Sequence, residues 1–271
     1  MSLWYQRKSG ATAEPDIFDS THRFETSTIL SPVTLGYIRL LIAAYGAATI
    51  IASALPSVRQ PDWPTNAQSF SYLSNITWWG ITGYHVVASF HTLYYARTGH
   101  APLERWHWTL QRAHEFLWTT IVTLPCMVTI VFWSIQYSPE KIATPADAWS
   151  NITKHALNSA FAVFEIVFSR VAQPPRIHGL LIAIILGGYA GIAFITLATQ
   201  GFMTYEFLDP SKHSHGIMAG TIIGMGALGV ALFGAVSTMV WARLWVTERY
   251  LRWRPNRYGN KNEKLELGAT L

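Results

Sequence analysis

The chain has 271 residues, of which 50% are hydrophobic and only 13% are charged, and its formal net charge is +5. Soluble globular domains carry about 25% charged residues, so the composition argues against an ordinary soluble domain and indicates a polytopic membrane protein. The single cysteine, Cys126, excludes an intrachain disulfide and a metal cage built from several thiolates.

Taken in chain order, the hydrophobic runs predict an all-α polytopic membrane protein with six transmembrane helices in one bundle. Residues 1–31 are polar, and we expect a cytosolic N-terminal arm there with no cleavable signal peptide. A six-helix transmembrane domain is expected over residues 32–246, and a basic cytosolic tail over 247–271. The predicted helices cover residues 33–55, 69–96, 113–137, 149–171, 177–202 and 217–246. Each is long enough to cross the ~30 Å hydrocarbon core.

Lysine and arginine are distributed unevenly between the predicted loops. Fifteen of them fall in the N-terminal arm, the second and fourth loops and the C-terminal tail, whereas the opposite side has four, namely Arg59, Lys141, Lys154 and Lys212. Because positive charge is enriched on the cytosolic side, both termini are predicted to be cytosolic. These basic residues flank spanning helices and suit anionic lipid headgroups, so we expect a membrane partner and no nucleic acid.

Two predicted helices carry polar side chains near their non-cytosolic ends. Polar groups inside a spanning segment usually face the bundle interior and mark function. The predicted helix 69–96 has Ser74, Asn75 and Thr77, and the predicted helix 149–171 has Asn151, His155 and Asn158, with Glu165 deeper. Thr77 and His155 are about 8 and 6 residues from the same surface, so they can share one depth at ~9–12 Å.

A threonine hydroxyl becomes a nucleophile when an adjacent base takes its proton, and histidine is the usual base. We therefore predict Thr77 and His155 as a catalytic pair. The other polar residues could orient the imidazole or stabilise an oxyanion, and Ser74 lies close enough to Thr77 to be a rival nucleophile. Each residue also has a structural interpretation: a helical threonine usually bonds its own backbone, and Glu165 could simply be hydrogen-bonded.

The remaining histidines and the glycines are interpreted as structural. His85, His91 and His114 are expected to be packing or interfacial residues, and the two histidines of the His213–His215 loop are a weak metal signal. No metal and no cofactor are predicted. Gly216, Gly220 and Gly224 recur at four-residue spacing, with Gly229 and Gly234 beyond them, and this glycine face favours close helix packing within the chain over dimerisation.

At these residues the sequence resembles the androgen-induced gene family of six-span membrane proteins, and most closely its fungal-type branch. The resemblance covers roughly residues 31–243 and is carried by residues 72–80, 110–114, 149–159, 164–166, 199–202 and 207–210. The family includes intramembrane threonine hydrolases for fatty acid esters of hydroxy fatty acids. Its nucleophilic threonine follows an aliphatic residue, as Thr77 does here, and its catalytic histidine lies four residues after an asparagine, as His155 does. Ile152 and Ala156 depart from the pattern of the characterised animal members.

Four functions follow from these patterns. The resemblance favours a lipid ester hydrolase acting on fatty acid esters of hydroxy fatty acids or similar acyl esters taken from the bilayer, with the endoplasmic reticulum as the default membrane. A membrane-bound isomerase or cyclase would use His155 and Glu165 for acid–base chemistry without a covalent intermediate. A haem-binding electron carrier would need histidine pairs that face each other across helices, for which His85, His91 and His114 are available, and the fourth alternative is a non-catalytic membrane adaptor. The acyl chain, the third catalytic group and the oligomeric state do not follow from the sequence.

Overall fold

The computed structural model describes residues 18–55 and 63–251, and every regular element within these ranges is helical. The α-helices are α1 Pro32–Ala54, α2 Asn66–Ser69, α3 Leu73–Thr98, α4 Trp108–Val131, α5 Pro145–Ile152, α6 Asn158–Phe168, α7 Ile177–Gln200 and α8 His215–Leu244. Short 3₁₀ turns are η1 Pro102–Arg105, η3 Pro139–Ile142 and η5 Glu206–Leu208. Three π-helical segments, η2 Phe132–Gln136, η4 Thr153–Leu157 and η6 Trp245–Tyr250, continue or join α-helices.

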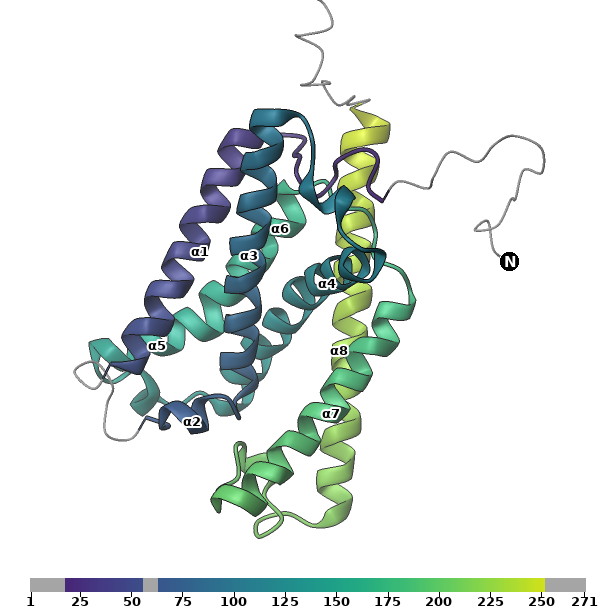
Figure 1. Cartoon of the computed structure of the whole chain (residues 1–271). Helices are drawn as coiled ribbons and strands as arrows, with labels where there is room; N and C mark the ends of the chain where they lie inside the picture. The colour runs from purple at the N-terminus through teal and green to yellow at the C-terminus, as the bar shows by residue number, and fades with distance from the viewer. Residues whose placement is uncertain (1–17, 56–62, 252–271) are drawn as a thin grey trace, which may run out of the picture.

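The long helices pack as antiparallel neighbours. α1 lies along α3, and α8 extends through the length of the molecule, with α7 beside its lower part in this view (Figure 1). Small residues allow the close approaches: a side chain at Gly46 of α1 would collide with Thr82 of α3, and one at Gly229 of α8 would collide with Leu186 of α7. Helix α2 and the start of α5 lie at the same end of the molecule as the C-terminal end of α1 (Figure 1).

The structure confirms the expected close packing within the chain at Gly229, but not at Gly216, Gly220 and Gly224. A Cβ added at any of these three positions would meet no atom within 4 Å. They belong to the half of α8 nearer to His215, where the helix packs less extensively, whereas the close contact with α7 is made further along at Gly229. The four-residue spacing identified a face of small residues on α8, but it did not predict where along that face another helix packs.

Helix boundaries differ from the predicted ones in two places near the site. The predicted helix 69–96 is interrupted: α2 ends at Ser69, Tyr72 is extended, and α3 starts at Leu73. The backbone N–H of Leu73 donates to the hydroxyls of Tyr189 and Tyr205, at 3.1 and 3.2 Å, so distant residues cap this helix start. The predicted helix 149–171 instead begins at Pro145 and ends at Phe168, and the Thr144 hydroxyl caps its start by accepting from the N–H of Asp147.

Four helical segments are long and apolar enough to cross a membrane: Pro32–Ala54, Trp108–Gln136, Ile177–Gln200 and His215–Tyr250. The chain is therefore described as an integral membrane protein with several spanning helices. α3 and the α5–η4–α6 rod do not meet that standard among the described residues, because both carry polar side chains in the protein interior. In α3 these are Ser74, Thr77, Thr82, His85, Ser89, His91 and Thr92, all of them buried. The six-span scheme and the cytosolic termini stay predictions.

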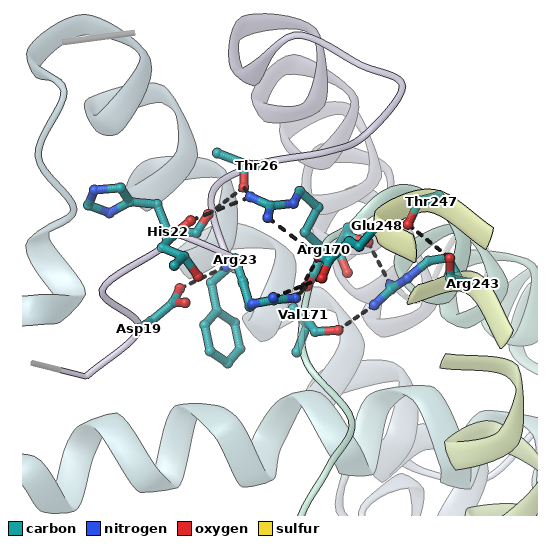
Figure 2. Close-up of polar contacts among 12 residues, drawn as sticks. Asp19, His22, Arg23, Thr26, Arg170, Val171, Arg243, Thr247 and Glu248 are labelled. Atoms are coloured by element: carbon teal, nitrogen blue, oxygen red, sulfur yellow. Dashed lines mark hydrogen bonds and ion pairs between the residues drawn. The ribbon is translucent and has the colours of Figure 1, made fainter. Parts of the chain in front are cut away.

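Charged side chains join the chain ends at the side of the bundle opposite to α2. Arg23, in the segment before α1, makes a two-point contact with Glu248 near the end of α8, at 2.8 and 3.0 Å (Figure 2). Arg170 reaches Glu248 at 3.4 Å and donates to the Thr26 hydroxyl at 3.1 Å. Arg243 of α8 donates to backbone carbonyls beyond α6, including that of Val171 (Figure 2). Residues 18–31 are thus packed onto the bundle, whereas residues 1–17 of the predicted arm lie outside the described residues.

Candidate functional site

Thr77 lies in the second turn of α3 and its hydroxyl has two partners. It donates to the carbonyl of Ser74 at 3.0 Å, the helical back-bond that threonine commonly makes, and it accepts from the side-chain amide of Asn158 at 3.0 Å. Asn158 is fully buried at the start of α6, and its amide also donates to the carbonyl of Lys154 at 3.3 Å. The sequence spacing placed Asn158 on the same helix face as His155, and in the structure the Asn158 side chain contacts Thr77 directly.

His155 lies in the π-helical segment η4, where its ring orientation is fixed from three sides. Its Nδ1 lies 2.9 Å from the carbonyl oxygen of Asn151, its ring stacks on Phe132 with centroids 3.7 Å apart, and Trp133 donates to its backbone carbonyl at 2.9 Å. A carbonyl can only accept, so Nδ1 carries the proton and Nε2 of the neutral ring holds the lone pair. Nε2 makes no hydrogen bond to any described residue. It is the nitrogen that is available to act as a base.

Two π-helical segments face each other at this point, because Phe132 and Trp133 belong to η2 and His155 belongs to η4. A π-helical turn adds a residue to the helical repeat and changes the direction of the side chains around it, and such turns are frequent at functional sites. The segment η4 therefore both presents the imidazole and turns the following residue, Asn158, toward α3.

A cavity of about 60 Å³ lies beside these residues, between α3, α4, η4, α7 and α8. Its lining is mostly apolar, and the polar residues in it are Ser74, Gln136, His155, Tyr189 and Tyr205. The Ser74 hydroxyl makes no hydrogen bond to a described residue, whereas Thr77 is not among the lining residues. The first turn of α3 thus brings Ser74 to the same space as His155. Thr77 is one turn further, facing Asn158, and no hydrogen bond joins Thr77 to His155 in the described structure.

The other predicted supporting residues lie away from this cavity. The Asn151 side-chain amide donates to the carbonyls of Lys141 and Asp147, at 2.7 and 3.1 Å, so only its backbone oxygen reaches the histidine. The Asn75 amide donates to the Ser69 carbonyl at 2.9 Å, and Asn75 lines a second cavity.

Glu165 forms a buried ion pair with Arg39 of α1, and both side chains are fully buried. The guanidinium meets the carboxylate at two points, at 2.8 and 2.7 Å, and its third nitrogen donates to the Phe24 carbonyl and the Thr92 hydroxyl, both at 2.7 Å. Glu165 is ten residues after His155, or ~15 Å along a helix. This arrangement favours the structural interpretation of Glu165.

The histidines outside the site pack among aromatic rings. His91 and His114 lie nearly parallel at 5.9 Å, and His114 also stacks on Tyr84 at 5.4 Å. His85 contacts the Ile81 carbonyl through Nδ1 at 2.7 Å. In the described part of the chain, no group of three or more His, Cys, Asp or Glu residues is arranged to hold a metal ion.

Sequence reasoning missed Phe132, Trp133, Tyr189, Tyr205 and Arg39. The aromatic residues gave no distinguishing signal in a chain with twelve tryptophans and twelve tyrosines. Arg39 did give a signal in the sequence, because a lone cation inside an apolar run needs a partner within the membrane. Glu165 was the available carboxylate.

One of the comparisons with known proteins found a match. The family described as FAR-17a/AIG1-like protein matches residues 38–240, which is well over half of the chain and includes α3, the π-helical segments η2 and η4 and the Thr77–Asn158 contact. No curated protein and no solved structure matches the chain. On the strength of the family match, the chain belongs to the FAR-17a/AIG1-like family.

Proposed function

We propose that this chain is an intramembrane lipid ester hydrolase in which His155 takes a proton from a hydroxyl on the first turns of α3. The observation that carries the proposal is the state of His155: Nδ1 is committed to the Asn151 carbonyl at 2.9 Å, and Nε2 is left without a partner beside an apolar cavity. An imidazole held in this tautomer is a ready general base, and apolar walls suit an acyl chain.

The proposed nucleophile is Thr77, as the family resemblance implies, and Asn158 holds its hydroxyl from the other side at 3.0 Å. Thr77 Oγ1 attacks the ester carbonyl while its proton passes to His155 Nε2, and the tetrahedral intermediate collapses as that proton is delivered to the leaving alcohol. Water, deprotonated by His155, then attacks the acyl-threonine; the carboxylic acid is released as His155 returns that proton to Thr77 Oγ1. The hydroxyls that line the cavity, Tyr205 among them, supply candidate donors for the oxyanion.

Ser74 is the rival nucleophile, and the cavity favours it, because Ser74 and His155 line the same space and the Ser74 hydroxyl has no described partner. In that case Thr77 and Asn158 would support the helix turn that carries Ser74. Attack by Thr77 requires its side chain to leave the Ser74 carbonyl and turn toward His155, a change of rotamer that the structure does not show. Catalytic hydrogen bonds are often longer in the ligand-free enzyme than in the reacting complex.

The proposed substrates are fatty acid esters of hydroxy fatty acids or similar acyl esters, drawn from the bilayer of the endoplasmic reticulum. The test is turnover of a panel of such esters by Thr77→Ala, Thr77→Ser, Ser74→Ala, His155→Ala and the double variant Thr77→Ala/His155→Ala, at matched expression in detergent. The two Ala variants of the pair and the double variant should lose activity to a similar extent, because one step is disabled. Thr77→Ser should keep part of it. Full activity of His155→Ala would refute the mechanism, and loss of activity in Ser74→Ala alone would move the nucleophile by one helical turn.

A membrane-bound isomerase using His155 and Glu165 is the second candidate. The described geometry gives it less support, because Glu165 is bound at two points by Arg39. A fluorophosphonate, which labels an activated hydroxyl, separates the two functions.

A further inference from the structure

A second cavity, of about 180 Å³, lies between the C-terminal end of α1, the start of α3 and α5. None of its lining residues lines the first cavity. The two cavities are on opposite sides of the contact between α3 and η4. Ser74 and His155 line the first cavity, whereas their chain neighbours Asn75 and Lys154 line the second. The second cavity is at the end of the molecule that carries α2 (Figure 1).

Lys154 brings a positive charge to this cavity, and no described residue supplies it with a negative partner. Its Nζ lies 5.8 Å from the centre of the Trp63 ring, and it makes no hydrogen bond or ion pair with any described residue. The acidic side chain nearest along its helix, Asp147, is already occupied, because it accepts from the Trp63 indole at 2.7 Å and from the Thr144 hydroxyl at 2.6 Å. A cation beside apolar walls without a counter-ion is costly, which makes the cavity attractive to an anion.

Ser150 adds a hydrogen-bond donor to the same wall. It lies four residues before Lys154, a spacing that puts both on one helix face. Its side chain is 6% exposed, lines the cavity and makes no hydrogen bond to a described residue. Trp78, Trp79 and Trp149 supply apolar walls. Further hydroxyl and amide side chains line the cavity, namely those of Thr49, Ser53, Ser69, Asn75 and Thr153, but Lys154 is the one charged residue among the described lining residues. A single cation beside aromatic rings matches a monoanionic head on an apolar chain, whereas a phosphate would bring more charge than the single lysine balances.

We propose that this second cavity binds the carboxylate of a long-chain fatty acid, with Lys154 as its counter-ion and Ser150 as a hydrogen-bond donor. The source of that acid rests on the proposed function: it is the acid that hydrolysis releases. Binding itself does not depend on turnover, so the site can be tested separately from the reaction.

The test uses the full chain in detergent and follows quenching of tryptophan fluorescence by dibromostearic acid. The matched ligand is its methyl ester, which has the same chain and no charge. The acid should reach half-quenching at a concentration roughly tenfold or more below that of the methyl ester, the size expected of one charge-assisted contact. Lys154→Met should remove the difference, Lys154→Arg should keep it, and Ser150→Ala should reduce it. Lys141→Met is the control, because it removes an exposed positive charge near the same end.

Equal half-quenching by acid and methyl ester in the wild type, or a preference that survives Lys154→Met, would overturn the proposal. Tighter, Lys154-dependent binding of a dibromostearoyl phosphatidic acid would overturn the assignment to a carboxylate. Asp62 lies outside the described residues. If Asp62→Asn binds the acid more tightly than the wild type does, Lys154 already has a carboxylate partner in the wild type, which would count against the proposal. If no ester is hydrolysed while the acid preference persists, the proposed function fails and the binding site stands.

Discussion

Replacing Arg39 by methionine should destabilise the bundle without touching the proposed chemistry. The change removes two charge-assisted contacts of 2.8 and 2.7 Å from Glu165 and two donors from the Phe24 carbonyl and the Thr92 hydroxyl. The contacts left to the carboxylate are long, at 3.4 Å from the Tyr84 hydroxyl and 3.6 Å from His85 Nε2. Glu165 would then be a buried charge with weak compensation.

Breaking a buried ion pair from one side costs ~3–5 kcal/mol, a large part of the ~5–15 kcal/mol that stabilises a typical domain. For a chain of this size, that corresponds to a fall in the unfolding temperature of roughly 6–20 °C. The double variant Arg39→Met/Glu165→Leu removes both charges and should recover most of the loss, because apolar replacements of buried pairs are often close to neutral.

The assay is thermal unfolding in detergent for both single variants and the double variant, with fluorophosphonate labelling scaled to the folded fraction. Labelling per folded molecule should stay at the wild-type rate. A Glu165→Leu variant as stable as the wild type would refute the energetic argument. A folded double variant that no longer reacts with the probe would show that Glu165 takes part in the chemistry.

Three further predictions concern the ends of the bundle and the support of the histidine. Burial and the nearby Asp19 raise the pKa of Glu25 to about 8, against the opposing effect of Arg39. The pKa of Glu25 in the folded protein lies above its value near 4.5 in the unfolded chain, so the stability that comes from the neutral carboxyl is complete below pH 4.5 and is lost up to about pH 8, at no more than ~1.4 kcal/mol per pH unit. Glu25→Gln should flatten this decline when unfolding temperatures are measured from pH 5 to 8.5. An unchanged slope would contradict the prediction. Trp133→Phe removes the 2.9 Å contact to the His155 carbonyl and should slow fluorophosphonate labelling several-fold while the fold is kept, whereas an unchanged rate would show that this contact does not help to position His155. Tags at both ends should be digested by protease in sealed microsomes with a cytosolic-side-out orientation, and a protected tag at either end would reject the six-span topology.

Local patterns predicted the helices and many of their inward faces. Thr77 and Asn158 were identified as polar residues of adjoining interior faces, and the structure joins them at 3.0 Å. Thr144 and Asp147 form a helix-start pattern in the sequence, but the predicted helix began later, at the apolar run that starts at residue 149. These features depend on residues three or four apart, which periodicity detects.

Features that depend on distant parts of the chain could not be read in the same way. The start of α3 at Leu73 is set by Tyr189 and Tyr205, more than a hundred residues later. Asn151 serves through its backbone oxygen, which no side-chain pattern reveals. The π-helical turn that directs His155 adds one residue to the helical repeat, so the regular spacing assumed for this helix placed the residues beyond it only approximately.

The most direct test of the central claim is to map the covalent adduct that a fluorophosphonate leaves on the protein. The full chain is labelled in detergent and digested, and mass spectrometry of the peptide that spans the start of α3 locates the modified residue. We predict an adduct on Thr77 in the wild type, and no adduct in His155→Ala. An adduct on Ser74 would transfer the nucleophile to the residue that lines the cavity, and wild-type labelling of His155→Ala would contradict the account of the site.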